Sequence, residues 1–264
     1  MQDLDAYLSR IGLAGRPSLA ELHRAHVSSI AFENLQSHGG EPVSLALSDL
    51  ERKIVGSGRG GYCFEHNLLF AAALQELGLE VEPMLARVRW AAPPGTVRPR
   101  GHLLLRVTGE GGVWHADVGF GAGTLLEPIP FGPGEEHEQA GWRYRVVQDG
   151  EELVLQSVLE GRWSDLYAFI PKPAPLVDLE TSNWFTCTHP ASPFVTGLLI
   201  ACQSADGTRT TLSDWGELGL AEQTPAGRTV TPVERAQLPR LLSERFGLDG
   251  FTLDGSGRVV RAAS

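Results

Sequence analysis

Lysine is scarce in this chain, because Lys53 and Lys172 are the only lysines among 264 residues. Schiff-base chemistry on an active lysine therefore has few candidates. Basic residues in general are outnumbered, with 22 Lys and Arg against 32 Asp and Glu, which gives a formal net charge of −10. Binding to phosphate backbones requires clustered Lys and Arg, so the composition argues against nucleic acid as a partner.

Cysteines and long apolar runs are also lacking. The three cysteines, Cys63, Cys187 and Cys202, are too few and too unevenly spaced for a disulfide framework, and they predict free thiols in a reducing compartment. The sequence has no apolar run long enough to span a membrane, and its acidic first residues do not have the pattern of a signal peptide. We therefore expect a cytoplasmic protein with no membrane partner, in which each cysteine is either a core residue or a nucleophile.

The first third of the sequence has the periodicity of helices. Helices are expected at residues 3–13, 18–30, 44–55 and 63–78. Ser18 and Glu21 have the spacing of a capping box at the start of the second helix. The fourth helix is apolar on nearly every side up to Gly78, which predicts a position at the centre of a bundle.

After Gly78 the pattern changes to short, partly alternating segments separated by turn residues. They predict antiparallel strands, in a sheet or barrel, at residues 80–90, 102–108, 113–120, 142–149, 152–161 and 163–170. An exposed loop is expected at residues 94–102. Later strands are expected at residues 193–205, 207–214, 227–233 and 251–254, with a helix at residues 234–247.

Cys63 follows two glycines at the expected first turn of a helix. Free amide N–H groups and the positive end of the helix dipole favour the thiolate there, and the thiolate is the nucleophilic form of cysteine. Small buried cysteines are also common, so local context alone leaves a nucleophile and a core residue equally open.

A thiolate nucleophile needs a base, and the base needs an acceptor that orients it. His102 opens a predicted strand directly after a loop. Asp117 lies in an otherwise apolar strand, where a buried carboxylate needs a partner. If the two strands form a hairpin, the two side chains lie far from its turn on opposing strands and can pair.

Three other histidines compete for the role of base: His66 on the helix of the cysteine, His115 on the strand of the aspartate, and His189. Cys187 and His189, together with Cys63 and His66, also raise the question of a zinc site. Their spacing does not match the usual paired ligand motifs, so no metal is expected.

Five motifs occur in the same order as in a known enzyme family. They are IAFENL (residues 30–35), RGGYCFEHN (59–67), GHLLL with His102, ADVGFG (116–121) and NWFTCTHPASPF (183–194). Together they resemble the arylamine N-acetyltransferases, and the match is weaker beyond residue 194. The resemblance implies an α+β fold, similar to that of papain-like cysteine enzymes. Its parts would be an N-terminal helical bundle (1–84), an antiparallel β-barrel (85–190) and a C-terminal α/β lid (191–264).

The resemblance also implies a reaction. By position, Cys63 matches the cysteine that carries the acetyl group, and His102 and Asp117 complete a Cys-His-Asp triad. Members take acetyl from acetyl-CoA onto the cysteine and pass it to an arylamine, arylhydrazine or N-hydroxyarylamine. This ping-pong scheme agrees with the thiolate chemistry expected from the residues, and acetyl-CoA is the implied co-substrate.

Other motif residues have expected roles. By resemblance, Phe120 and Phe32 would wall the acceptor pocket, and a place in the barrel core is the alternative for Phe120. Gly121 and Gly123 would let backbone amides approach an anionic group such as the CoA pyrophosphate. Residues that depart from the usual pattern of the family are Ala31, Cys187, Pro193 and Gln203, in place of proline, serine, histidine and arginine.

Arg59 and Glu33 are expected to tie the IAFENL segment to the cysteine loop as an ion pair rather than to act in catalysis. Three other functions are alternatives to acetyl transfer. An amide synthase would use the same triad on a carrier-bound acyl thioester. A thiol hydrolase or transglutaminase would resolve the acyl-enzyme with water or a peptide amine. A non-enzymatic binding domain would leave Cys63 unreactive.

Overall fold

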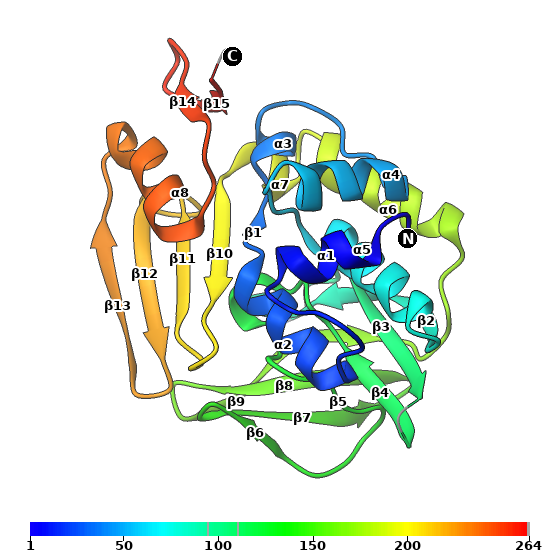
Figure 1. The fold of residues 1–264 in the computed structure, drawn as a ribbon. Coiled ribbons are helices and arrows are strands. Elements are labelled where there is room, and N and C mark those ends of the chain that lie inside the picture. Colours follow the sequence, from blue (N-terminus) through cyan, green and yellow to red (C-terminus); the bar gives the residue numbers. More distant parts are fainter. Residues whose placement is uncertain (94, 110, 263–264) are drawn as a thin grey trace.

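The structure is a computed structural model that describes residues 1–93, 95–109 and 111–262. It consists of a helical part, an eight-stranded antiparallel sheet curled into a nearly closed barrel, and a five-stranded C-terminal sheet (Figure 1). The predicted α+β fold class is confirmed. The division of the chain at residues 84 and 190 stays a prediction.

The N-terminal part is helical. Its elements are α1 (Leu4–Arg10), α2 (Leu19–Ser29), α3 (Leu35–His38), α4 (Leu47–Leu50), the π-helical turn η1 (Glu51–Gly56) and α5 (Cys63–Glu76). The capping box predicted for Ser18 and Glu21 is present at the start of α2. The helix expected at residues 44–55 is instead the short α4 followed by the wider turn η1. Most residues of α5 are buried, as its apolar sequence predicts.

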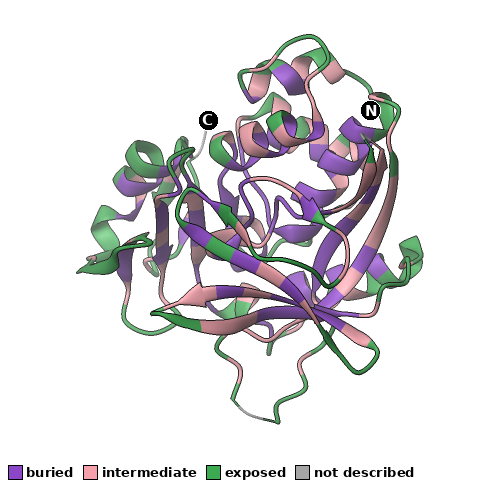
Figure 2. Cartoon of the chain, turned by 90° about the horizontal axis from the view of Figure 1, so that it is seen from below, coloured by how far each residue is buried: buried purple, intermediate pink, exposed green. Residues whose placement is uncertain are grey.

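The barrel carries the hairpin on which the predicted histidine and aspartate lie. Its strands are β2 (Glu80–Val88), β3 (His102–Gly109), β4 (Gly112–Ala116), β5 (Ile129–Pro130), β6 (His137–Gln139), β7 (Trp142–Asp149), β8 (Glu152–Leu159) and β9 (Arg162–Phe169), in the order β5-β4-β3-β2-β9-β8-β7-β6. Gly109 pairs with Gly112 and Leu105 with Ala116, so β3 and β4 form the expected hairpin. The crossing strands are buried along much of their length, whereas the loops at the rim are exposed (Figure 2).

The C-terminal sheet is joined to the cysteine loop through its first strand. Its strands are β1 (Phe32–Glu33), β10 (Leu199–Gln203), β11 (Arg209–Ser213), β12 (Gly219–Thr224) and β13 (Gly227–Pro232). The remaining elements are η2 (Gly121–Gly123), α6 (Leu176–Thr188), α7 (Pro193–Thr196), η3 (Arg235–Gln237), α8 (Leu238–Phe246) and the pair β14 (Phe251–Leu253) and β15 (Val259–Arg261). Because β1 comes from the IAFENL segment, this sheet is anchored beside the start of α5 (Figure 1).

Several elements were not anticipated from the sequence, among them α3, β5, β6, α6, β12 and β15. The helix α6 begins after Pro175, and its exposed Leu176, Val177 and Trp184 hide the apolar stripe by which an amphipathic helix is usually predicted. The strand β12 was also missed, and the segment expected to begin a strand at residue 193 begins with α7 instead. Across the described residues, no helix is long and apolar enough to cross a membrane.

Candidate active site

Cys63 is the first residue of α5, at the position the sequence predicts. Tyr62 is the N-cap residue, and Glu65 accepts the backbone N–H of Tyr62 at 3.0 Å, as in a capping box. The cysteine is buried, with 3% of its surface exposed, and its thiol donates to the carbonyl of Gly101 at 3.6 Å. The thiol therefore lies at a helix N-terminus, against the residue that precedes His102.

His102 and Asp117 meet at the open end of the β3–β4 hairpin. His102 is the first residue of β3, whereas Asp117 lies one residue beyond the end of β4. The strand expected at residues 113–120 is thus shorter than predicted. His102 Nε2 donates to Asp117 Oδ2 at 2.7 Å, and both side chains are buried.

Asp117 accepts three further hydrogen bonds. The hydroxyl of Tyr167 donates to Oδ2 at 2.8 Å, while Asn67 Nδ2 and the Gly119 amide donate to Oδ1 at 3.0 and 2.9 Å. The backbone N–H of Asp117 itself donates to Nε2 of His23 at 3.2 Å. Because hydrogen bonds reach both carboxylate oxygens and the backbone, the orientation of Asp117 is fixed.

The ionisation of the pair follows from these contacts. Burial on its own would lower the pKa of His102, but the charge of Asp117 and hydrogen bonds to Asp117 and Cys63 outweigh it and raise this pKa to about 10. Burial would raise the pKa of Asp117, yet the charge of His102 and the bonds from His102, Asn67 and Gly119 lower it to about 2. At neutral pH the pair is an imidazolium beside a carboxylate.

His66 and His115, the histidines that compete with His102, form hydrogen bonds with other residues. His66 Nε2 donates to the carbonyl of Ala31 at 3.2 Å, and its Nδ1 accepts from His26 at 2.8 Å. His115 Nε2 lies 2.7 Å from the hydroxyl of Tyr167. Burial lowers the pKa of His66 and of His115 to about 4, so both rings are neutral. Of His66, His102 and His115, only His102 has a pKa that interaction with Cys63 raises.

Gly119 allows the aspartate segment to pass over the start of α5. A Cβ at this position would lie 2.8 Å from Cys63 Cα and 2.8 Å from Asn67 Nδ2. Any side chain would therefore push the segment that carries Asp117 away from the cysteine.

The residues expected to contact substrates lie around the same point. The ring of Phe120 is 5.0 Å from the ring of His102, centroid to centroid. Phe32 packs against Gly121, where a Cβ would lie 3.5 Å from the phenylalanine ring. Gly121 has a φ of +74° and opens η2, and a Cβ on Gly123 would lie 2.8 Å from the ring of Phe120. These contacts place Phe120 beside His102, Gly123 against Phe120, and Gly121 against Phe32.

His189 stacks on Phe185, with ring centroids 4.3 Å apart. No cluster of three or more His, Cys, Asp or Glu side chains in the described ranges could hold a metal ion.

Some residues of the site carried no assignment from the sequence. Asn67 follows Cys63 by about one helical turn within the RGGYCFEHN motif, and this spacing is a signal that could have identified it. Tyr167 and His23 lie 50 and 94 residues from Asp117 along the chain, and no local pattern marks either of them.

A thiol at a helix N-terminus beside an ion-paired imidazolium is suited to attack on an acyl carbon. The imidazolium can protonate a leaving group, and the neutral ring can then take a proton from an incoming nucleophile. The fold and the site together define a candidate for thiol-dependent acyl transfer.

Comparison with known proteins identifies the family. A family model described as N-acetyltransferase matches residues 17–251. The arylamine N-acetyltransferase of Mycolicibacterium smegmatis is 39% identical over 270 residues, covering 99% of this chain and 97% of that protein. A Salmonella typhimurium protein named arylamine N-acetyltransferase / N-hydroxyarylamine O-acetyltransferase is 33% identical over 250 residues, covering 93% of this chain and 88% of that protein.

Solved structures agree with this result. The structure of Mycobacterium marinum arylamine N-acetyltransferase in complex with CoA matches with a TM-score of 0.88 at 39% identity, covering 93% of each chain. The chain belongs to the arylamine N-acetyltransferase family.

Proposed function

We propose that this protein transfers the acetyl group of acetyl-CoA to an arylamine, arylhydrazine or N-hydroxyarylamine through an acetyl-cysteine intermediate. The observation that carries the proposal is the position of Cys63 at the start of α5, where its thiol contacts the residue before His102, whose charged form is favoured by Asp117 and by Cys63. A relative in the same family is solved with CoA, which supports a CoA thioester as the donor.

In the first half-reaction, the Cys63 thiolate attacks the acetyl carbonyl carbon of acetyl-CoA. A carbon–sulfur bond to Cys63 forms, the bond to the CoA sulfur breaks, and the His102 imidazolium gives its proton to the departing CoA thiolate. Asp117 stays ionised throughout, holding the ring so that Nδ1 faces the sulfur atoms while Nε2 donates to the carboxylate.

In the second half-reaction, the neutral amine attacks the acetyl carbon on Cys63. The new carbon–nitrogen bond replaces the bond to sulfur, and His102, now neutral, takes the proton that the amine loses. The imidazolium and the thiolate are thereby restored. Arylamines suit this step because their low basicity leaves them unprotonated near neutral pH.

The substrate contacts follow from the same geometry. Phe120 lies beside His102, and Phe32 lies behind Gly121, so these two rings would flank the aromatic ring of the acceptor. We assign the amides of η2, between Gly121 and Gly123, to the anionic part of CoA, because a tight glycine turn exposes backbone N–H groups.

Intact-mass measurement tests this proposal. Mixing the protein with acetyl-CoA in the absence of amine is expected to add one acetyl group, about 42 Da, and adding a simple arylamine is expected to remove it. The adduct is expected to be absent in Cys63→Ser and present in Cys187→Ala, a matched control that alters another buried cysteine.

An adduct that forms on Cys63 but is lost to water as fast as to amine would indicate a hydrolase instead. If acetyl-CoA leaves the protein unmodified at pH 8, acetyl-CoA is not the donor and the proposal fails. Modification by a carrier-bound acyl thioester would then favour the amide synthase.

A further inference from the structure

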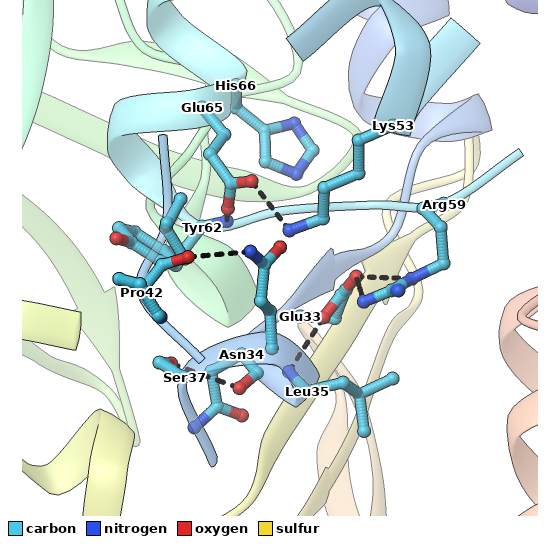
Figure 3. Close-up of polar contacts among 12 residues, drawn as sticks. Glu33, Asn34, Leu35, Ser37, Pro42, Lys53, Arg59, Tyr62, Glu65 and His66 are labelled. Carbon is cyan, nitrogen blue, oxygen red and sulfur yellow. Dashed lines mark hydrogen bonds and ion pairs between the residues drawn. The ribbon is translucent and has the colours of Figure 1, made fainter. Parts of the chain in front are cut away.

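The loop before Cys63 is closed by two ion pairs that do not touch the sulfur (Figure 3). Glu33 accepts two hydrogen bonds from Arg59, at 2.9 and 2.6 Å. The second pair joins Lys53 Nζ to Glu65 Oε1 at 2.6 Å. These pairs place two carboxylates and two cations at the loop, so their charges cancel when all four groups are ionised.

Glu65 links the second pair to the nucleophile. Its Oε2 is the acceptor for the backbone N–H of Tyr62, while its Oε1 faces the ammonium of Lys53 (Figure 3). A Cβ on Gly61 would lie 2.7 Å from Oε2 of this carboxylate, which explains why a glycine stands there. One carboxylate thus caps the first turn of α5, from which the Cys63 thiol projects, and at the same time accepts from a lysine.

This cap depends on a positive partner. The side chain of Glu65 is 1% exposed and that of Lys53 is 14% exposed. Water therefore cannot solvate the Glu65 carboxylate well if the lysine is lost. Burial raises the pKa of Glu65, the charge of Lys53 opposes this, and the nearby charge of Glu33 raises it further. The pKa of Tyr62 is raised by its burial and by the charge of Glu65, and its hydroxyl donates to Asn183.

Lys53 is placed by the π-helical turn η1. Its carbonyl accepts the backbone N–H of Arg59 at 3.2 Å, so the same residue holds the loop by its backbone and the cap by its side chain. Single π-helical turns are rare, and those that occur are frequently found at functional sites. The only other lysine, Lys172, is exposed and has no carboxylate within 4.0 Å in the described part of the chain.

We infer that Lys53 is a positioning residue for Cys63. By pairing with Glu65, it keeps the cap of α5 as a carboxylate on the Tyr62 amide and cancels the negative charge that this cap would otherwise place near the sulfur. The inference rests on the proposed function in one respect, that Cys63 is the nucleophile.

Alkylation by iodoacetamide tests the inference, because this probe needs neither an acetyl donor nor an amine. The rate of modification is read for Cys63, Cys187 and Cys202 separately, by peptide mass, between pH 5.5 and 9. Lys53→Met is expected to slow alkylation of Cys63 on the order of tenfold at neutral pH, and to move its pH profile to higher pH. Lys172→Met, the matched control, is expected to match the wild type.

Two rescue variants separate positioning from a general loss of structure. Lys53→Arg restores the cation, and the double variant Lys53→Met with Glu65→Gln replaces the charged cap by a neutral amide that still accepts from Tyr62. Both are expected within about threefold of the wild-type rate. An effect of Lys53→Met smaller than twofold, or a folded double variant as slow as Lys53→Met, would overturn the inference.

If Lys53→Met does not fold, the double variant carries the test. A rate within about threefold of the wild type supports the inference, and a folded double variant slower by about tenfold overturns it. Acetylation by acetyl-CoA is measured on the same samples. If the wild-type protein takes no acetyl group but the Lys53 variants show the expected alkylation rates, the proposed function fails and the inference about Lys53 stands.

Discussion

The two sides of Cys63 use buried ion pairs in different ways. On the barrel side, His102 and Asp117 form a buried pair whose charged state would supply the proton in the acyl transfer that we propose. On the bundle side, the pairs of Glu33 with Arg59 and Lys53 with Glu65 stop short of the sulfur and hold the loop that delivers it. A buried ion pair can thus have either of two proposed roles. It can take part in the reaction when it lies at the reacting sulfur, or it can hold the loop that carries Cys63 when it does not.

The largest effect is expected from breaking the barrel side. Asp117→Asn leaves the shape of the site but removes the charge that keeps His102 protonated and oriented. We expect kcat/KM for acetyl-CoA and an arylamine to fall about 10⁴-fold, as for other triads that lose their carboxylate. Steady-state kinetics measures the loss, with Asp149→Asn on the exposed surface as the control. A loss smaller than tenfold would mean that Asp117 has no role in the chemistry.

Removing the ion pair of Glu33 and Arg59 on the bundle side is expected to affect mainly the stability of the fold. Glu33→Gln leaves the buried guanidinium of Arg59 without its carboxylate, which is expected to lower the free energy of unfolding by about 3–5 kcal/mol. Urea unfolding measures this change. Asp49→Asn, which breaks the exposed pair with Arg52, is the control and is expected to have a much smaller effect because water screens that pair. Equal effects of the two substitutions would remove the contrast between buried and exposed pairs.

The buried histidines on the two sides of Cys63 make the free energy of unfolding depend on pH, with His102 acting in the opposite direction to the others. The raised pKa of His102 stabilises the fold fully below about 6.5, and this contribution is lost as pH rises towards about 10. His23, His66 and His115, with pKa values lowered to about 4, stay neutral while the unfolded chain takes up protons, so stability falls as pH drops from about 6.5 to 4.

The free energy of unfolding is therefore expected to be highest near pH 6.5. It should fall on either side by up to about 1.4 kcal/mol per pH unit for each proton involved. Urea titrations at several pH values measure the profile. Asp117→Asn is expected to flatten its alkaline side, because His102 loses the partner that raises its pKa. A maximum at pH 8 or above would contradict this account.

The smallest effect is expected at the edge of the barrel-side network. Tyr167→Phe removes one of the hydrogen bonds to Asp117 and leaves the others in place. We expect the rate of Cys63 acetylation to fall about tenfold, the value of one hydrogen bond to a charged group. Stopped-flow mixing with acetyl-CoA measures it. A rate equal to that of the wild type would show that the remaining donors hold the carboxylate without the tyrosine.

The sequence predicts much of the fold and of the candidate site because local patterns encode them. The start of α5 at Cys63 follows from two glycines and an apolar helix, and the hairpin that pairs His102 with Asp117 follows from two strands about a turn. The family motifs then predict which cysteine and which histidine act together.

Other parts depend on contacts between distant segments. His23 reaches the backbone of Asp117 across 94 residues, and no pattern in α2 distinguishes it from a core histidine. The helix α6 was missed because packing, rather than an apolar stripe, decides its conformation. The role of Lys53 depends on a π-helical turn, which sequence periodicity does not reveal.

The most direct test of the central claim is the protonation state of His102. Nitrogen-15 NMR of histidine-labelled protein at pH 7.5, assigned with His102→Gln, distinguishes an imidazolium from a neutral ring. Our account predicts that both ring nitrogens of His102 carry protons, while His66 and His115 are neutral. A neutral His102 at this pH would contradict the claim that the barrel-side network supplies the proton for acyl transfer.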